Sequence, residues 1–303
     1  MSRNTKEKDV DGWIVIDKPE GITSTSTVNR VRRALTAKKA GHAGTLDPEA
    51  TGVLAIALGE ATKTIQYVTD DLKAYAFTIR LGQATDTDDA TGRIIATSKS
   101  RPSDSEIRAI LECFIGNIQQ VPPKFSAIRV NGQRAYHLAR RGKNPYLTAR
   151  SLWVESLIMA NRQDNDHIDL EMTCGKGGYV RAIARDLGEK LGCFGHVCRL
   201  RRLWSGPFSL KTALHLSSID KLDKGLILEN YRLPTEVALL RLRELKCTAE
   251  GAIKLQNGNP AAINTDRLKF GEQCWASFEG QIVAIGKFMN GELHPVRVFQ
   301  KPT

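Results

Sequence analysis

The order in which strand-like and helix-like stretches follow one another constrains the fold of this chain more than any other feature. Residues 73–81 and 167–174 alternate apolar and polar side chains, which is typical of half-buried strands. Residues 103–114 place an apolar stripe on one helical face, behind a Ser103–Glu106 capping box. Because the stretches follow no regular strand–helix–strand rhythm, the sequence predicts an α+β fold with a mixed, mainly antiparallel central sheet flanked by helices and loops.

Shorter signals complete the expected elements of the first 190 residues. Strands are predicted at residues 13–17, 53–58, 94–96 and 126–130. Helices are predicted from about residue 25, at residues 136–141 and at residues 179–191. Residues 41–52 are expected to form a loop without regular secondary structure.

The character of the sequence changes after about residue 245. Turn residues cluster at residues 257–260, and short strands are predicted at residues 274–278, 282–285 and 296–299. A chain of 303 residues is long enough for one large domain and one small domain. We therefore expect a large domain, with room for a catalytic site, at residues 1–245 and a small β-rich domain at residues 246–303.

Positive charge is concentrated in three stretches that contain no acidic residue. The chain has 44 Lys and Arg against 33 Asp and Glu, a net charge of +11. Residues 21–46, 113–154 and 190–219 hold 17 of the basic residues, so the rest of the chain is net negative. If the three stretches meet around one site in the fold, they indicate a polyanionic partner. An ordinary solvated basic surface is the alternative interpretation.

Several classes of protein are disfavoured by the sequence. The first twelve residues contain no apolar segment typical of a secretory signal, and no apolar run has the length of a membrane helix. Six scattered cysteines do not resemble a disulfide framework, so we expect a cytoplasmic protein. Cys193, His196 and Cys198 cluster, but no second pair of ligands stands at zinc spacing. Fingerprints of nucleotide-binding loops are absent as well.

An acidic residue in an unusual setting remains. Asp47 lies in the glycine-rich loop near His42, directly after the first basic stretch. A carboxylate there can act as a nucleophile or a base. An Asx-turn before Pro48 is the alternative, because Asp-Pro is common in turns.

The loop and seven further segments resemble the TruB-type tRNA pseudouridine synthases. The sequence GHAGTLDPEATGVL at residues 41–54 is similar to the catalytic loop of that family, and DKPEGITS at residues 17–24 to its N-terminal block. The other matches follow in the family's order: KAYAF (73–77), GQATDTDD (82–89), PPKFSA (122–127), YHLAR (136–140), CGKGGYVR (174–181) and VRVF (296–299).

This resemblance implies a pseudouridine synthase fold followed by a small PUA-like RNA-binding domain. Members of the family isomerise the uridine at position 55 in the T loop of tRNA. The reaction breaks the N1–C1′ bond, rotates the base and rejoins it to the sugar through C5, with no cofactor and no metal. The resemblance therefore implies a tRNA T-arm stem-loop as the partner, with no guide RNA and no membrane.

The resemblance also assigns roles to the matching residues. Asp47 is the expected catalytic carboxylate, and Arg181 is the expected cation that keeps it ionised in an enclosed site. Tyr75 is expected to stack on the target base. Plain alternatives exist for the last two, because Arg181 could be an exposed helix residue and Tyr75 could belong to the core.

Four further residues match family positions for substrate binding. Tyr179 and Leu200 are expected to line the pocket, although both could serve only in packing. Asp89 corresponds to an aspartate near the active-site arginine, with an ordinary turn carboxylate as the alternative. His42 is expected to fill the gap that a flipped uridine leaves in the T loop.

Basic residues of the three stretches are expected to contact the RNA backbone and to converge on one face around Asp47. They are Arg30, Arg33, Lys38, Lys39, Lys124, Arg129, Arg140, Arg141, Arg201 and Arg202. The chain departs from the family pattern at Gly178, where threonine is usual, and at Asp88, which adds an acid to the Thr-Asp-Thr turn.

Three other functions fit parts of the sequence. An RNA-binding module could remodel tRNA without chemistry, and its binding would survive loss of the Asp47 carboxylate. A guide-RNA-dependent synthase would need partner proteins. A carboxylate glycosidase would need a second catalytic carboxylate, and no matched motif supplies one.

Overall fold

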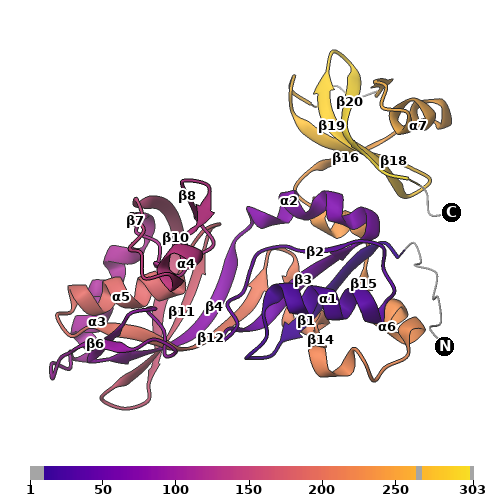
Figure 1. Cartoon of the computed structure of the whole chain (residues 1–303). Helices are drawn as coiled ribbons and strands as arrows, with labels where there is room; N and C mark the ends of the chain where they lie inside the picture. Colours follow the sequence, from indigo (N-terminus) through magenta and orange to yellow (C-terminus); the bar gives the residue numbers. More distant parts are fainter. Residues whose placement is uncertain (1–9, 264–267, 301–303) are drawn as a thin grey trace.

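The structure, a computed structural model, describes residues 10–263 and 268–300. Residues 1–9, for which the sequence predicts no secretory signal, lie outside this part. A large mixed sheet forms the body of the molecule, and a smaller C-terminal sheet stands at one side of it (Figure 1). No helix in the described ranges combines the length and the apolar character needed to cross a bilayer.

The main path of the large sheet runs through eight strands. In spatial order they are β14 (Leu214–His215), β1 (Gly12–Lys18), β3 (Thr51–Leu58), β12 (Gly195–Ser205), β4 (Lys73–Leu81), β11 (His167–Cys174), β10 (Arg150–Arg162) and β7 (Gly116–Gln120). Three short strands pair at its margins: β2 (Ala40–His42), β13 (Phe208–Ser209) and β15 (Arg232–Leu233).

Pairing in the large sheet is mainly antiparallel, as the sequence predicts. Only β1 with β14 and β12 with β3 run parallel among its described pairs. The long strands β4 and β12 pair along most of their length and join the two halves of the sheet (Figure 1). Two small hairpins project from the body: β5 (Gln83–Thr85) with β6 (Ile94–Thr97), and β8 (Arg129–Val130) with β9 (Gln133–Arg134).

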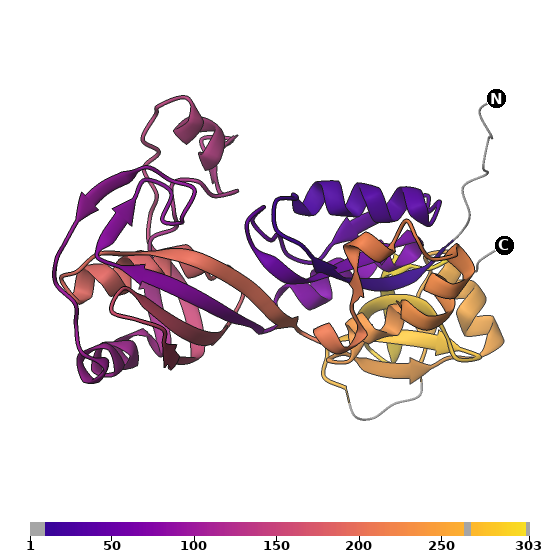
Figure 2. The ribbon, with the colours of Figure 1, turned by 90° about the horizontal axis from the view of Figure 1, so that it is seen from below.

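Helices and 3₁₀ turns cover the sheets. The α-helices are α1 (Ser24–Ala34), α2 (Ile65–Thr69), α3 (Asp104–Leu111), α4 (Ala135–Arg140), α5 (Val180–Lys190), α6 (Lys224–Tyr231) and α7 (Ala249–Gln256). The 3₁₀ turns are η1 (Gly59–Thr64), η2 (Glu112–Phe114), η3 (Leu210–Thr212), η4 (Leu216–Ser218) and η5 (Thr235–Leu239). Figures 1 and 2 show α1 and α4 on the same side of the large sheet.

Two apolar cores meet beneath the middle of the large sheet. One contains Tyr75 of β4 and the apolar face of α5, and the other contains Leu46 and the buried face of α1. Leu200 of β12 packs against both cores. The residues between the cores are therefore supported from two sides, and the candidate site lies there.

The predicted elements agree with the structure where the local pattern is strong. β4 and β11 have the predicted bounds, and α3 begins at the predicted capping box of Ser103 and Glu106. Two predictions were wrong. Residues 40–42 form β2, which pairs with β3, although a loop was expected from residue 41. Of residues 126–130, only Arg129–Val130 form a strand, and Ser126 and Ala127 line a pocket instead.

The C-terminal sheet has the order β16 (Arg243–Lys246), β18 (Gln273–Phe278), β19 (Gln281–Met289), β20 (Glu292–Val298) and β17 (Ala261–Ala262). It encloses its own apolar core, to which α7 contributes Leu255. Because β16 pairs with β18, we propose that the second domain begins near Arg243 rather than at residue 246.

Candidate active site

Ser24, at the start of α1, holds the loop that carries Asp47. The Ser24 hydroxyl donates to the backbone oxygen of Leu46 (2.9 Å) and accepts from its backbone nitrogen (2.8 Å). The Asp47 carbonyl accepts a hydrogen bond from Ala50 N at 3.1 Å. The loop therefore has a fixed shape, and the Asp47 side chain remains partly exposed at 43%.

Lys18 also holds the loop that carries Asp47, and the sequence did not identify it as a site residue. Its side chain is fully buried, and its ammonium donates to the carbonyls of Pro19 (2.8 Å), Ile22 (2.9 Å) and Pro48 (2.9 Å). Burial lowers the pKa of Lys18 to about 8. The available signal was its place in the DKPEGITS block, because nothing else in the sequence distinguishes it from an exposed lysine.

Arg181 is the cation beside Asp47. Its Nη2 lies 2.8 Å from Asp47 Oδ2, and its Nη1 lies 3.5 Å from Asp89 Oδ2. The same guanidinium donates to the carbonyls of Thr87 (3.1 Å) and Phe125 (3.0 Å). Arg181 is only 6% exposed, so it is not the solvent-facing helix residue that the sequence left possible.

Asp89 serves its own turn and also faces the arginine. Its Oδ1 accepts from the hydroxyls of Thr87 (2.7 Å) and Thr91 (2.6 Å). The other carboxylate oxygen is the one near Arg181. The two interpretations of Asp89 are therefore compatible, because one residue closes the turn and lies beside the guanidinium.

A pocket of about 280 Å³ opens in front of the carboxylate. Five residues predicted for catalysis or substrate binding line it together, namely Asp47, Tyr75, Tyr179, Arg181 and Leu200, and Arg202, predicted as a backbone contact, lines it as well. Asp47, Arg181 and Leu200 also line an adjoining cavity of about 250 Å³, into which Asp89 is exposed. The structure thus brings together residues from a loop, two strands and a helix.

Tyr75 lies both in the apolar core and at the pocket wall. It is 7% exposed and packs in the core, yet it also lines the pocket. Burial raises its pKa, so the phenol keeps its proton at neutral pH. The backbone of Tyr179 is held by the Gln120 side chain through contacts of 3.0 and 3.2 Å, a connection that the sequence did not reveal.

Lys73 and Ser126 also line the pocket and were missed as site residues. Lys73 donates to the carbonyls of Thr69 (2.9 Å) and Asp71 (2.6 Å). Burial, followed by the charge of Arg202, lowers the pKa of Lys73 to about 8. Both residues stand inside segments that resemble the family, which was the only available signal.

Arg202 supports the loop that carries Asp47 and lines the pocket, so its predicted contact with an RNA backbone stays a prediction. It is 1% exposed, and its guanidinium donates to the carbonyls of Val53 (2.7 Å) and Gly44 (3.1 Å). A Cβ at Gly52 would lie 2.2 Å from the Arg202 carbonyl oxygen, so only glycine allows the strands to approach this closely. The buried arginine therefore stabilises the position of the loop.

His42 lies at the beginning of the same loop but outside the pocket wall. It pairs with Ile56 in the β2–β3 ladder. Burial, followed by the charge of Arg202, lowers the pKa of His42, which favours the neutral imidazole.

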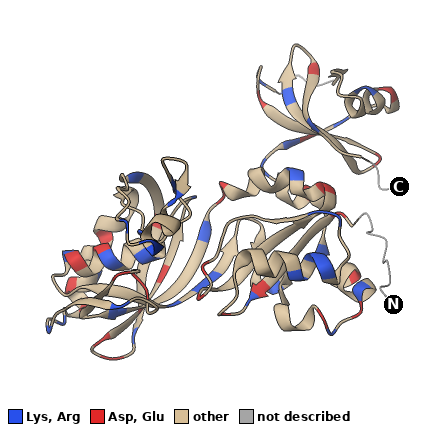
Figure 3. Ribbon diagram, viewed as in Figure 1, with Lys and Arg blue, Asp and Glu red and all other residues tan. Residues whose placement is uncertain are grey.

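The other predicted backbone contacts differ in exposure. Arg30 pairs with Asp220, and Arg201 pairs with Asp17 through two contacts of 3.0 and 2.8 Å. Exposed basic residues remain along α1, the following loop and residues 124–141, which include α4 and are called the α4 segment below (Figure 3). They are Arg33, Lys38, Lys39, Lys124, Arg129, Arg140 and Arg141.

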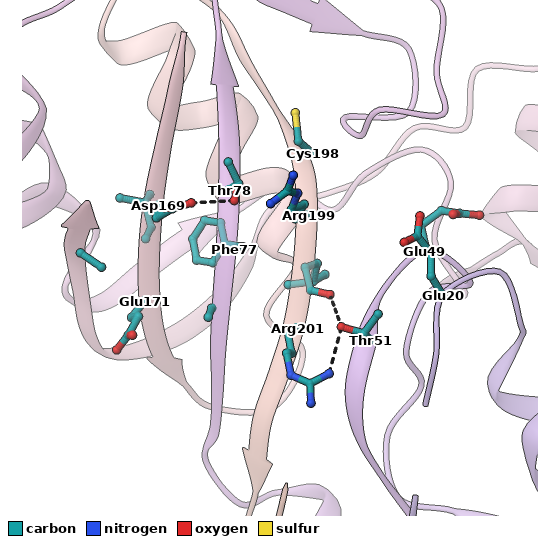
Figure 4. A pocket seen from close by; sticks show the side chains of 14 residues that line it. Glu20, Glu49, Thr51, Phe77, Thr78, Asp169, Glu171, Cys198, Arg199 and Arg201 are labelled. Carbon is teal, nitrogen blue, oxygen red and sulfur yellow. Dashed lines mark hydrogen bonds between the residues drawn. The ribbon is translucent and has the colours of Figure 1, made fainter. Parts of the chain in front are cut away.

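A third cavity, of about 310 Å³, lies along β4, β11 and β12 (Figure 4). Arg199 and Arg201 line it, and the alternation of side chains along β12 directs both away from the face on which Leu200 packs into the core. Arg199 and Arg201 of the third stretch therefore do not line the Asp47 pocket, whereas Arg202 of the same strand is buried and does line it. The convergence of all three basic stretches around Asp47 stays a prediction.

The cluster of Cys193, His196 and Cys198 shows no ligand geometry. The imidazole Nδ1 of His196 lies 3.1 Å from the carbonyl of Gln83, and the Cys193 thiol contacts a backbone carbonyl. Within residues 10–263 and 268–300, no group of three or more His, Cys, Asp or Glu side chains is arranged to hold a metal ion.

Comparison with known structures identifies the fold. A chain of an H/ACA RNP bound to a substrate RNA containing 2′-deoxyuridine superposes with a TM-score of 0.72 at 22% identity, covering 96% of this chain and 86% of that chain. A chain of a Cbf5-Nop10-Gar1 complex gives a TM-score of 0.71 at 23% identity, covering 95% and 84%. These likenesses establish the shared fold.

Comparison of sequences identifies the family. Residues 32–180 match the TruB family pseudouridylate synthase (N terminal domain), and residues 181–240 match the tRNA pseudouridylate synthase B C-terminal domain. The tRNA pseudouridine synthase B of Ruegeria pomeroyi is 60% identical over 302 residues, which covers 100% of both chains. That of Caulobacter sp. (strain K31) is 46% identical over 308 residues, covering 99% of each. This chain belongs to the TruB family of pseudouridylate synthases.

Proposed function

We propose that this chain isomerises uridine to pseudouridine at position 55 in the T loop of tRNA, acting in the cytoplasm without a guide RNA. One observation carries the proposal: the Asp47 carboxylate stands at a pocket lined by Tyr75 and is held by a buried arginine, Arg181. The names of the full-length relatives, which are tRNA pseudouridine synthases B, agree with the substrate class.

The reaction needs only groups that the pocket contains. The N1–C1′ bond breaks, a C5–C1′ bond forms, C5 loses a proton and N1 gains one, so no electron donor or second substrate is consumed. Asp47 can attack C1′, add to C6 or remove a proton from the sugar, and each route requires an ionised carboxylate. Arg181 places a fixed positive charge 2.8 Å from Asp47 Oδ2.

Enclosure of the pocket requires the target nucleotide to leave the stacked loop. Unstacking a base costs a few kcal/mol. Stacking on an aromatic ring returns about 1–3 kcal/mol, and Tyr75 offers such a ring at the pocket wall. We infer that His42 fills the vacated position in the T loop, since it lies outside the pocket on the same loop as Asp47.

The exposed cations suit an RNA helix on one side of the sheet. α1 and the α4 segment lie on the same side (Figure 2), and both carry exposed arginines. Backbone contacts of this kind position an RNA, whereas its loop shape decides which base reaches the carboxylate. We further propose that the small C-terminal sheet is a PUA-like domain that adds to RNA binding.

Conversion of an unmodified tRNA transcript by the purified chain tests the proposal. The expected result is a single pseudouridine at position 55, with no added RNA or protein. Product at another position would contradict the T-loop assignment. Product formed only with a guide RNA and partner proteins would favour the guide-dependent class, and salt-sensitive binding without product would favour an RNA-binding module.

A further inference from the structure

Two arginines one turn apart on α5 hold the same two segments of the chain. Arg181 donates to the Thr87 carbonyl in the turn after β5 and to the Phe125 carbonyl in the segment after β7. Arg185 reaches the same turn and the same segment at other residues. Its Nη1 lies 3.1 Å from Asp88 Oδ2, and its Nη2 donates to the Val121 carbonyl at 2.8 Å.

The contacts of Arg185 with Asp88 and Asp186 are half-buried, whereas its bond to the Val121 carbonyl is exposed. The side chains of Arg185 and Asp88 are 22% and 15% exposed. Arg185 also contacts Asp186, its neighbour on α5, at 2.8 Å. A half-buried guanidinium with a forked set of acceptors fixes geometry better than a surface ion pair, because its planar donors lose less freedom for each bond formed.

Asp88 is held in place by its backbone as well as by its side chain. Its φ of +62° lies in the left-handed region, which aspartate tolerates better than most residues. Its carbonyl accepts a hydrogen bond from Val197 N at 3.1 Å. Asp88 therefore attaches the turn to β12 through its carbonyl and to α5 through Arg185, and it stands between Thr87 and Asp89, the two residues of the turn that contact Arg181.

We propose that Arg185 and Asp88 form a positioning pair for the reaction, which holds residues 85–92 and 121–127 against α5 so that Arg181 stays aligned on Asp47. The inference rests on the proposed function. Neither member of the pair lines the Asp47 pocket, so both act through Arg181 and not on the substrate.

Single-turnover kinetics on saturating tRNA test the pair. Arg185→Gln and Asp88→Asn are expected to slow pseudouridine formation by about 10- to 100-fold, because small misplacements at a reacting centre have effects of this size. The Kd for tRNA should change less than about twofold, since neither residue contacts the pocket. Arg185→Lys keeps the positive charge but loses the forked donor geometry of the guanidinium. Its rate of pseudouridine formation should lie between those of the wild type and Arg185→Gln.

Arg162→Gln is the matched control, because it breaks an ion pair of 2.8 Å between β10 and Asp104 far from the pocket. It should lower Tm without slowing the reaction of the folded protein. If Arg185→Gln also lowered Tm without slowing the reaction of the folded protein, the pair would only stabilise the fold. If Arg185→Gln weakened tRNA binding while the saturated rate stayed unchanged, Arg185 would contact RNA. Either outcome would overturn the proposal.

A readout without substrate separates this proposal from the proposed function. The Nε–H of Arg181, assigned by its loss in Arg181→Lys, is expected to exchange with solvent more rapidly in Arg185→Gln than in the wild type or in Arg162→Gln. Unchanged exchange would refute the positioning role even if the enzyme were active. An inactive wild type with the expected change in exchange would refute the proposed function and leave the pair supported.

Discussion

Arg181 Nη2 lies 2.8 Å from Asp47 Oδ2, and the two side chains differ in exposure, at 7% for the arginine and 43% for the aspartate. The protein therefore encloses the cation and presents the carboxylate. Two backbone carbonyls and Asp89 hold the guanidinium in place. A substrate entering the pocket would meet a carboxylate whose counter-charge is already fixed.

Replacing Arg181 by lysine is expected to lower kcat by about 100-fold or more, because electrostatic groups aimed at a reaction centre contribute this much. Lysine keeps the charge but cannot serve Asp47, Thr87 and Phe125 from one planar fork. Steady-state kinetics on a tRNA transcript measure the effect. An Arg181→Lys variant with wild-type kcat would show that the forked geometry is dispensable.

Tyr75→Leu should weaken capture of the flipped base by about 1–3 kcal/mol, the range for loss of one stacking contact. Tyr75→Phe keeps the ring and is the matched control. Tyr75 also packs in the core, so unfolding of both variants in urea must be measured beside their activity. Equal activity of the leucine and phenylalanine variants would contradict a stacking role.

Buried Lys73 makes the stability of the protein depend on alkaline pH. Its pKa of about 8 is lower than the value of about 10.4 expected in the unfolded chain. Between these values the unfolded state binds more protons, so the free energy of unfolding should rise with pH, by at most about 1.4 kcal/mol per pH unit.

The comparison with Lys73→Met isolates this effect from other titrating groups. Relative to the variant, the wild type should gain stability from pH 8 to pH 10 in urea unfolding, with no such trend below pH 7. A difference that stayed constant over the whole range would show that the burial of Lys73 does not perturb its protonation.

Gly178, which stands where the family usually has threonine, is required by its neighbours here. A Cβ at this position would lie 2.8 Å from Cys174 Sγ and 3.2 Å from Leu152 Cδ1. Gly178→Thr should therefore destabilise the protein by about 1–3 kcal/mol, as overpacking usually does. Cys174→Ala should recover most of that loss in the double variant.

Gly175→Ala is the control for Gly178→Thr, because its Cβ would meet Trp153 atoms at an ordinary 3.6 Å. Chemical denaturation of Gly178→Thr, Cys174→Ala, the double variant, Gly175→Ala and the wild type measures these differences in stability. If Gly178→Thr were as stable as the wild type, the tight contact with Cys174 would not explain the absence of threonine.

Local periodicity predicted only part of the fold. β4 and α3 were predictable because each repeats its own pattern over eight or nine residues. β10 and β12 were not. Both contain register shifts, at Val154/Ser156 and Met159/Asn161 in β10 and at Val197/Arg199 and Arg202/Trp204 in β12, and each shift interrupts the two-residue period. Their identity as strands depends on partners far away in the sequence.

Motifs located the carboxylate and its arginine, but they did not reveal what holds them. Lys18 and Arg202 read as surface cations, because residues of these types are rarely buried. Each donates to at least one carbonyl of a distant segment, Pro48 for Lys18 and Val53 and Gly44 for Arg202. Such an arrangement exists only after the strands have paired, so no local sequence pattern predicts it.

Pseudouridine formation by Asp47→Asn measures the central claim most directly. Asparagine has nearly the same shape, so tRNA binding and Tm should stay close to those of the wild type, whereas the nucleophile or base is lost. Under single-turnover conditions with an unmodified T-arm stem-loop, the wild type should convert the target uridine and Asp47→Asn should form no detectable product. Conversion by Asp47→Asn at the wild-type rate would contradict the assignment of the chemistry to this carboxylate.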